Sequence, residues 1–303
     1  MQKNIMLFLS FLAQLFSITA FSQEQVEIDK SEIKSSLLWK ISGKDIKTPS
    51  YLFGTIHAIC SDDYFFTDLM KIAFKETNQL VLEVNLSDPS TSANFQELMM
   101  LTDGKRLSDF FSNEEEFNQF ADKLRTKAEM DIEPFIGFKP FVLISALSMK
   151  AFSCPVTASY EMNLMDMSKQ TAMPVIGLET LESQLAIFDK MSDSEIKNLL
   201  VSAIGEDEDN HNQERMLIEL YKQQDLDGIY TLMSSSKELM GHESKLLTIR
   251  NANWVKQLPA ILNKNSNFIA VGAAHLPGEL GIINLLRKLQ SIGLSQHWTI
   301  MLT

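Results

Sequence analysis

Apolar residues along this chain fall into two patterns, which predict two kinds of secondary structure. Short continuous apolar runs bounded by Gly, Pro or polar residues are typical of strands, and their continuity favours strands covered on both faces. The first two runs flank a turn over 43–49 and predict a hairpin. The predicted strands cover 36–41, 51–54, 79–84, 174–178, 267–271 and 298–302.

Apolar residues at three-to-four spacing lie between these runs and predict helices. One predicted helix begins near Ser192–Glu195 with a polar N-cap, and another, over 278–290, ends in cations followed by Gly293. The other predicted helices cover 67–76, 95–101, 114–127, 140–151, 160–171 and 207–221. We therefore expect an α/β fold with a central mixed sheet and a largely helical middle insertion or cap at about 90–170.

Two of the predicted strands are followed by the same motif, Gly-x-x-His. The first is Gly54-Thr55-Ile56-His57 and the second is Gly272-Ala273-Ala274-His275. This form is typical of a buried strand that ends in a turn permitted by Gly and places an imidazole at the strand exit. A single motif carries little information, since a lone His is more often structural than a ligand. The pair, in a chain with five histidines, predicts one shared site.

Carboxylates near strands are candidates to join the histidines. Glu83 interrupts the apolar run 80–84, where a carboxylate is costly unless it is paired, hydrogen-bonded or bound to metal; the alternative is a solvated strand face. Glu179 closes a strand, at the side of an α/β sheet where ligands usually bind. Glu161 opens a helix and either interacts with the helix N-terminus or takes part in the site.

Arg250 and the adjacent Asn251 are the other candidate polar residues. An arginine can clamp a carboxylate or stabilise an oxyanion, although it is more often an ion-pair partner. The sequence contains no Gly-x-Ser-x-Gly, P-loop, Gly-x-Gly-x-x-Gly or His-Glu-x-x-His motif. Acyl-enzyme hydrolysis, nucleotide chemistry and zincin-type proteolysis therefore lose support.

The N-terminus predicts export. Residues 1–22 combine Lys3, a short apolar stretch and small residues near a cut at Ser22 or Gln23, which is typical of a secretory signal peptide. The alternative is an uncleaved membrane anchor. A polar tether is expected over 23–36, followed by one α/β domain over 37–303, with no stable membrane span after cleavage and a periplasmic or secreted location.

Net charge and cysteine content further narrow the possible classes of function. The formal net charge is −12, and removal of the signal, which carries one lysine and no acid, makes it −13. Such an acidic chain argues against nucleic-acid binding. In an exported chain, Cys60 and Cys154 favour a disulfide that ties the first Gly-x-x-His loop to the central helical segment; two buried thiols are the alternative.

Five segments, in this order, resemble the TraB/GumN family over about residues 39–302. They are Tyr51–His57, Val81–Val84, Gly177–Thr180, Arg250-Asn251 and Val271–Gly278. The family is similar to Tiki-type metal-dependent peptidases and, more distantly, to erythromycin esterase-like and ChaN-like heme-binding proteins. The resemblance implies that the paired motifs and glutamate form the site. Ala274 stands where many relatives carry Gly.

The leading hypothesis is an exported metal-dependent hydrolase, most simply a peptidase, that acts on a peptide or small-molecule substrate through a metal-activated water. One alternative is a periplasmic heme- or peptide-binding protein without turnover, and another is a metal-free His/Glu esterase. The expected ion is Mn, Co or Zn. The predicted ligands are His57, His275, Glu83 and Glu161, and the predicted catalytic residues are Glu83, Glu179 and Arg250, with Glu83 as third ligand or general base.

Overall fold

A mixed six-stranded sheet, with strand order β6-β4-β7-β2-β1-β8, forms the centre of the computed structural model. The model describes residues 35–43, 46, 48–204, 207–235, 244–291 and 298–302. The strands are β1 (Leu38–Gly43), β2 (Ser50–Thr55), β4 (Gln79–Val84), β6 (Val175–Glu179), β7 (Asn267–Gly272) and β8 (Trp298–Leu302). The predicted α/β fold class is confirmed.

Strand direction divides the sheet into two parts. The neighbours β6, β4, β7 and β2 are parallel, whereas β1 runs antiparallel to both β2 and β8. The pairing of Leu38 with Phe53 confirms the predicted hairpin. Since β2 and β7 are parallel and Thr55 pairs with Gly272, both Gly-x-x-His motifs leave the sheet at the same edge.

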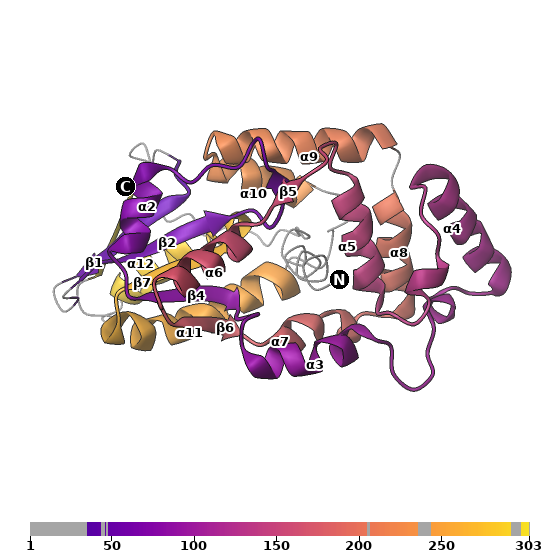
Figure 1. Cartoon of the computed structure of the whole chain (residues 1–303), viewed down its shortest axis with the longest axis horizontal. Coiled ribbons are helices and arrows are strands. Elements are labelled where there is room, and N and C mark those ends of the chain that lie inside the picture. The colour runs from indigo at the N-terminus through magenta and orange to yellow at the C-terminus, as the bar shows by residue number, and fades with distance from the viewer. Residues whose placement is uncertain are drawn as a thin grey trace.

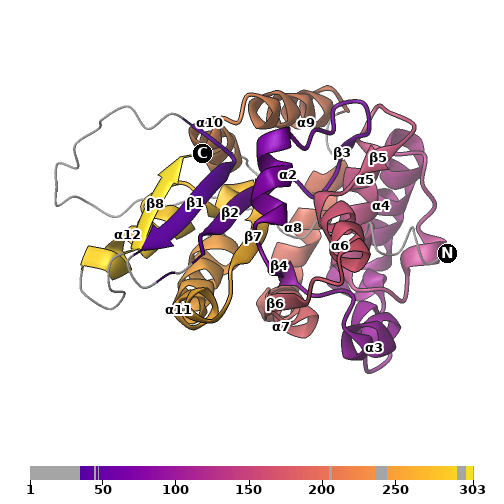
Figure 2. The ribbon, with the colours of Figure 1, turned by 60° about the vertical axis from the view of Figure 1, so that its left-hand side comes forward.

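Helices cover both faces of the sheet (Figures 1 and 2). On one face, α2 (Asp68–Lys75) and α6 (Tyr160–Gln170) pack on the central strands: the Phe74 ring centroid lies 5.3 Å from that of Phe268, and Tyr160 lies 5.7 Å from Phe53. The other face carries α11 (Ile249–Lys264) and α12 (Ile282–Ser291). Burial on both faces explains why these strands are continuously apolar.

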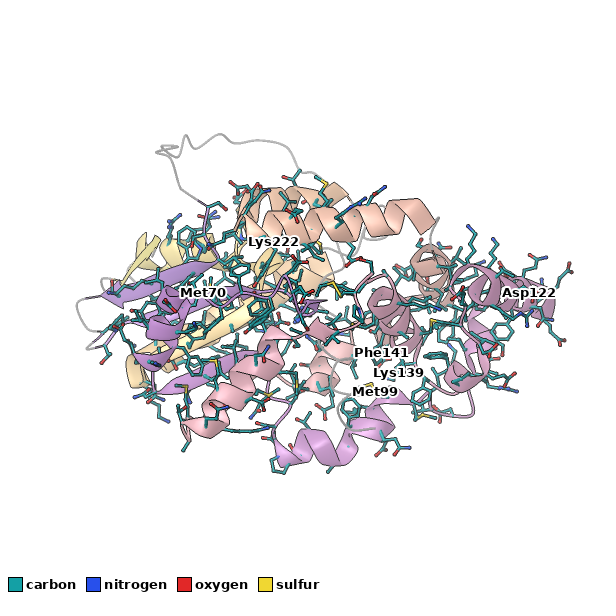
Figure 3. All side chains as sticks on the ribbon, turned by 45° about the horizontal axis from the view of Figure 1, so that its top comes forward. Met70, Met99, Asp122, Lys139, Phe141 and Lys222 are labelled. Carbon is teal, nitrogen blue, oxygen red and sulfur yellow. A yellow bond between two sulfur atoms is a disulfide. The ribbon has the colours of Figure 1, made fainter. Side chains whose placement is uncertain are left out.

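The remaining helices lie at the right, along the top and along the bottom of Figure 1. Figure 3 shows Met99, Lys139 and Phe141 within this helical part, where the Lys139 amide donates to the Met99 carbonyl at 2.8 Å. The helices are α3 (Pro89–Met99), α4 (Glu114–Lys127), α5 (Pro140–Lys150), α7 (Leu181–Leu185), α8 (Asp193–Ile204), α9 (Asp207–Lys222) and α10 (Leu226–Ser235).

The sequence pattern missed some elements. Helix α11 was not expected; it contains Pro259, which lacks an amide hydrogen and normally disfavours a helix interior. It follows a π-helical turn, Ser244–Thr248. Helix α12 begins at Ile282 rather than at Gly278. The predicted signal peptide and most of the tether lie outside the described residues, within which no helix is long and apolar enough to cross a membrane.

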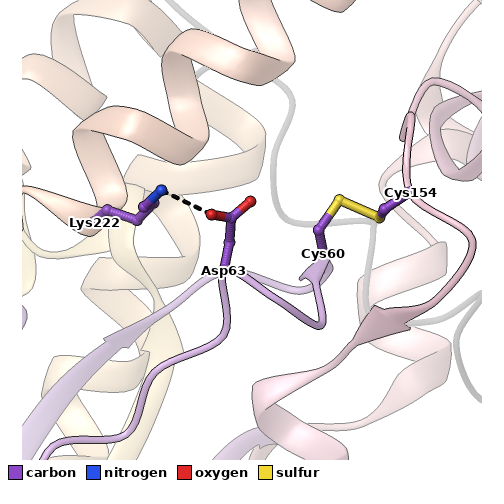
Figure 4. Close-up of a disulfide and its surroundings, with 4 residues drawn as sticks. All are labelled: Cys60, Asp63, Cys154 and Lys222. Carbon is purple, nitrogen blue, oxygen red and sulfur yellow. Dashed lines mark hydrogen bonds and ion pairs between the residues drawn. A yellow bond between two sulfur atoms is a disulfide. The ribbon is translucent and has the colours of Figure 1, made fainter.

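A disulfide joins Cys60 to Cys154, as Figure 4 shows. Cys60 ends β3 (Ile59–Cys60), and Cys154 lies shortly before β5 (Thr157–Ala158), which pairs antiparallel with β3. The loop after His57 is thus attached to the segment that leads into α6. Its other side is attached to α9, because Lys222 Nζ lies 2.7 Å from Asp63 Oδ1.

Candidate functional site

His57 lies at the exit of β2 and is oriented by a carboxylate. Its Nδ1 lies 3.0 Å from Glu161 Oε1, which also accepts a 2.6 Å hydrogen bond from Thr55 Oγ1. The hydroxyl of Ser159, the N-cap of α6, lies 3.1 Å from the other oxygen of Glu161. With Nδ1 bonded to an acceptor, the lone pair of the neutral ring lies on Nε2.

The Nε2 atom of His57 is buried and has no hydrogen-bond partner among the described residues. Burial opposes protonation of this ring, but the charge and hydrogen bond of Glu161 raise the pKa of His57 above its ordinary value. A buried polar nitrogen without a partner is unusual, since such groups are nearly always satisfied. The geometry therefore marks His57 Nε2 as an atom that is available for a ligand.

His275 receives the same kind of support at the exit of β7. Its Nδ1 lies 2.6 Å from Asn251 Oδ1, so Nδ1 donates and Nε2 carries the lone pair. The amide nitrogen of Asn251 donates to the carbonyls of His275 and Leu280, which determines the orientation of its side chain. The Trp254 ring packs on the imidazole, with centroids 4.5 Å apart.

Arg250 connects His275 to the two glutamates of the parallel strands. Its Nε and Nη2 donate to Glu179 Oε1 at 2.9 and 2.6 Å, and Nη2 also donates to Glu83 Oε2. Its Nη1 donates to the Leu246 carbonyl and to His275 Nε2, each at 3.1 Å. A guanidinium has five N–H donors, so these contacts account for all of them.

Glu83 is buried at the centre of this network. Its Oε1 accepts a 2.8 Å hydrogen bond from the Gly272 amide and lies 3.9 Å from His275 Nε2, while Gln184 Nε2 donates to Oε2 at 3.2 Å. Burial raises the pKa of Glu83, but Arg250 and the two histidines outweigh it and lower the pKa to about 2. Glu83 is therefore ionised at neutral pH, and the alternative of a solvated strand face does not apply.

Burial is the largest cause of the pKa shifts of Glu179 and His275. Burial raises the pKa of Glu179 above its ordinary value, although Arg250 acts against it. Burial and the charge of Arg250 lower the pKa of His275 to about 3, so this ring is neutral. A neutral imidazole is the form that binds a metal.

The structure brings all of the predicted site residues to one edge of the sheet, in two groups that are each held together by hydrogen bonds. His57 and Glu161 form one pair, and Arg250 binds Glu83, Glu179 and His275 in the other. The charges of His57 and Glu83 act on each other across the gap between the groups.

The donor atoms suit a divalent ion without forming a complete site. Within the described ranges, no three His, Cys, Asp or Glu side chains are grouped as metal ligands. Glu161 contacts Nδ1 of His57 rather than the side of the ring that carries Nε2. The available Nε2 of His57, the neutral ring of His275 and the ionised Glu83 are donors of the kind that Mn, Co and Zn accept.

Gly54 of the first motif is required by close packing rather than by a positive φ. Within the described residues, only Gly104 and Gly278 are glycines with positive φ, so the expectation of a Gly-permitted turn at Gly54 and Gly272 was wrong. A Cβ on Gly54 would lie 3.1 Å from both Cα and Cβ of Ala273. Glycine there lets the two turns approach each other.

Sequence reasoning missed the residues that support the site. Thr55, Ser159 and Gln184 each hold a carboxylate by one hydrogen bond, and Trp254 packs on both His275 and the Arg250 guanidinium. Their residue types and spacing are ordinary for surface and core positions. The one available signal is the four-residue spacing of Arg250 and Trp254, which places them on one helix face.

Comparison with known proteins identifies the chain's relatives. The family model described as TraB/PrgY/gumN matches residues 37–290. The chain belongs to the TraB/PrgY/gumN family. The family match includes both Gly-x-x-His turns, Glu83 and Arg250, and it therefore covers the whole candidate site.

Among characterised relatives of this TraB/PrgY/gumN protein is one described as Metalloprotease TIKI2, from Danio rerio. The two are 32% identical over 74 residues, which are 24% of this chain and 14% of the relative. The chain thus aligns with a small part of that protein's length. No solved structure matches the chain.

Proposed function

We propose that this family member is an exported metal-dependent hydrolase that cuts peptide bonds. The observation that carries the proposal is the buried Nε2 of His57, which has no partner among the described residues and lies at the same sheet edge as His275. Both rings have Nδ1 bonded to an oxygen acceptor, the arrangement that orients metal-ligating histidines. The name of the TIKI2 relative, a metalloprotease, supports the same class.

His57 Nε2, His275 Nε2 and the Glu83 carboxylate are the atoms that would hold the ion. A divalent metal bound there supplies Lewis-acid polarisation and makes a water molecule more acidic. For His275 to ligate, the contact between its Nε2 and Arg250 Nη1 must be given up. The ion would be Mn, Co or Zn, which elemental analysis distinguishes.

The other residues have supporting roles in this proposal. Glu161 orients His57 through Nδ1, which replaces its earlier assignment as a ligand, and Asn251 does the same for His275. Arg250 keeps Glu83 ionised in a buried position, and Glu179 holds Arg250. Because all five N–H groups of Arg250 are engaged, direct oxyanion binding would require one of these contacts to break.

The same His57–Glu161 pair supports a second candidate, ester hydrolysis without metal. A histidine whose Nδ1 is held by a carboxylate has its Nε2 free to accept a proton from water, as a general base requires. In this candidate Glu161 orients the base and stabilises the imidazolium. Hydrolysis that persists at the full rate in excess chelator would favour it over the metal-dependent reaction.

Metal content tests the proposal directly. Protein that begins at Gln23 and is purified without chelator is analysed by elemental mass spectrometry, before and after reconstitution with Mn, Co or Zn. We expect near-stoichiometric metal that is lost in His57→Ala/His275→Ala and retained in His211→Ala, a histidine of α9. Wild-type stoichiometry in the folded double variant would overturn the ligand assignment, and a Soret band on heme titration that needs both histidines would favour heme binding.

Glu161→Gln tests the supporting role of Glu161 at His57. Loss of the carboxylate charge beside Nδ1 should weaken metal binding by about 10- to 100-fold, as removal of an outer partner of a ligating histidine typically does. Thr55→Val, which removes only the hydroxyl that bonds Glu161, is the milder matched variant. Unchanged metal affinity in Glu161→Gln would refute the orienting role.

Export rests on the apolar segment before residue 22 and on the disulfide. The full chain is expressed in a bacterial host, and the mature N-terminus and the cell fraction are determined by mass spectrometry. Cleavage near Ser22 or Gln23 and recovery from the periplasm or medium are expected. An intact N-terminus on protein in the membrane fraction would instead support an uncleaved anchor.

A further inference from the structure

A pocket lies between the two Gly-x-x-His turns and the helices α9 and α10. Its floor is formed by 55–57 and 272–274, and its empty space is about 310 Å³ including the opening to solvent. Helix α10 packs against the turn at Ala273–His275. His57, whose Nε2 has no partner in the described chain, is part of the floor, so the pocket adjoins the proposed reaction site.

The roof of the pocket is built by two helix faces. Leu217 and Tyr221 lie one turn apart on α9, and Ile229 and Met233 lie one turn apart on α10. Residues at this spacing share one helix face, so each helix presents a pair of side chains to the same space. The roof is thus mainly apolar and comes from elements that are separate from the sheet.

Apart from His57 Nε2, which the proposed function assigns to the metal, the polar side chains that line the pocket are hydrogen-bonded within the protein. The Tyr221 hydroxyl donates to the Gly54 carbonyl at 2.9 Å, and the Thr55 hydroxyl donates to Glu161. None of the pocket-lining side chains is an acid, lysine or arginine. Away from His57, a charged group placed there would lose its water without gaining a charged partner, whereas an apolar group would gain by burial.

We propose that this pocket binds an aliphatic side chain, such as that of valine or leucine, of the substrate residue that adjoins the bond to be cut. The proposal rests on the proposed hydrolase function and specifies its substrate class. Ile229 and Met233 of α10 set the size limit of the pocket, and the small residues Gly272, Ala273 and Ala274 leave the floor open. The expected preference for aliphatic over charged residues at this position is about tenfold or more.

Peptide cleavage tests the preference. Internally quenched octapeptides with one randomised position at a time are digested, and mass spectrometry locates the cut. Wild-type protein should prefer Val or Leu over Glu, Lys and Phe beside the cut. Ile229→Phe, which fills the pocket, should shift the preference to Ala or Gly, and Ile229→Ala should admit Phe; Ile229→Val is a mild variant for which folding is least at risk. Thr231→Ala, exposed on the same helix, should match wild type.

A binding measurement keeps the pocket testable if no peptide is cut. Fluorescein-labelled Gly-Ser heptapeptides that differ only in a central Leu, Val, Glu or Lys are titrated with wild type and the Ile229 variants, and anisotropy is recorded. Binding that favours Leu and Val and weakens in Ile229→Phe upholds the pocket, even if the hydrolase proposal fails. Cleavage without an aliphatic preference overturns the pocket proposal and leaves the hydrolase proposal standing. If the peptides are neither bound nor cleaved, both proposals are overturned.

Discussion

The Cys60–Cys154 disulfide should contribute several kcal/mol to stability, and its loss can be measured in Cys60→Ala/Cys154→Ala. The bridge closes a loop between residues 94 apart in sequence. In the chain-entropy model, closing a loop of this length lowers the conformational entropy of the unfolded chain by about 16 cal/mol/K. This corresponds to about 4.7 kcal/mol of stability at 25 °C. Since measured values run from about 2 to 5 kcal/mol, we expect a loss near the upper end.

The native structure offers little to offset this loss. Two backbone contacts do not depend on the bridge: residue 60 pairs with Thr157 between β3 and β5, and the Ser61 amide donates to the Val156 carbonyl at 3.0 Å. Those contacts preserve the local fold of the variant without restricting its unfolded state. The effect should therefore appear in global stability more than in native spectra.

Urea unfolding, followed by circular dichroism and by tryptophan fluorescence, measures the difference. The two probes must give coincident transitions for a two-state free energy to apply. The variant should unfold at lower urea with a larger m-value, because its denatured state is less compact. Wild type incubated with reductant is the matched control and should approach the variant.

A small effect would refute this reasoning. If intact mass shows that wild type contains the bridge and the free energies of unfolding differ by less than about 1 kcal/mol, loop closure does not control stability here. If the variant then lost protection from hydrogen exchange only over residues 57–63, the disulfide would act locally, on the loop after His57.

Three further predictions concern packing and charge. Gly54→Ala should lower the free energy of unfolding by about 1–3 kcal/mol in urea titrations, because its Cβ meets Ala273 backbone at 3.1 Å; wild-type stability would contradict this. Arg250→Met should cost about 3–5 kcal/mol by leaving buried carboxylates unpaired, and adding Glu83→Gln should restore part of it; no restoration would reject the pairing. The Lys197 hydrogen bond and the Ser112 amide lower the pKa of Glu116 to about 2. Its contribution is therefore present above pH 4.5 and lost as the pH falls toward 2; urea unfolding at several pH values should show Glu116→Gln converging with wild type, and a constant difference would argue against it.

Much of the sheet and several helices were predictable because they depend on local pattern. Continuous apolar runs identified the six strands of the main sheet, and helices α4 and α6 were expected at nearly their observed bounds. Helix α11 was not predictable in this way. Its Pro259 interrupts the usual helical signal, and its stability comes from packing against the sheet face and α12.

The candidate residues were predictable as a set, but their contacts were not. Glu161 was expected as a metal ligand, and the structure places it on Nδ1 of His57. Arg250 was expected either to stabilise an oxyanion or to be an ion-pair partner, and all of its donors are bound to the protein. Buried ion pairs depend on which side chains share a low-dielectric space, and spacing along the chain carries no information about that.

The sequence by itself determined the local features of the site: a repeated Gly-x-x-His at two strand ends, an acid within an apolar run and a cysteine after the first motif. Only the tertiary structure decided that β2 and β7 are parallel neighbours, which places His57 and His275 at one edge. It also placed α9 and α10 over that edge to form the pocket. The reason is physical: strand pairing and helix packing bury surfaces from segments far apart in the chain, and local preferences do not specify which segments meet.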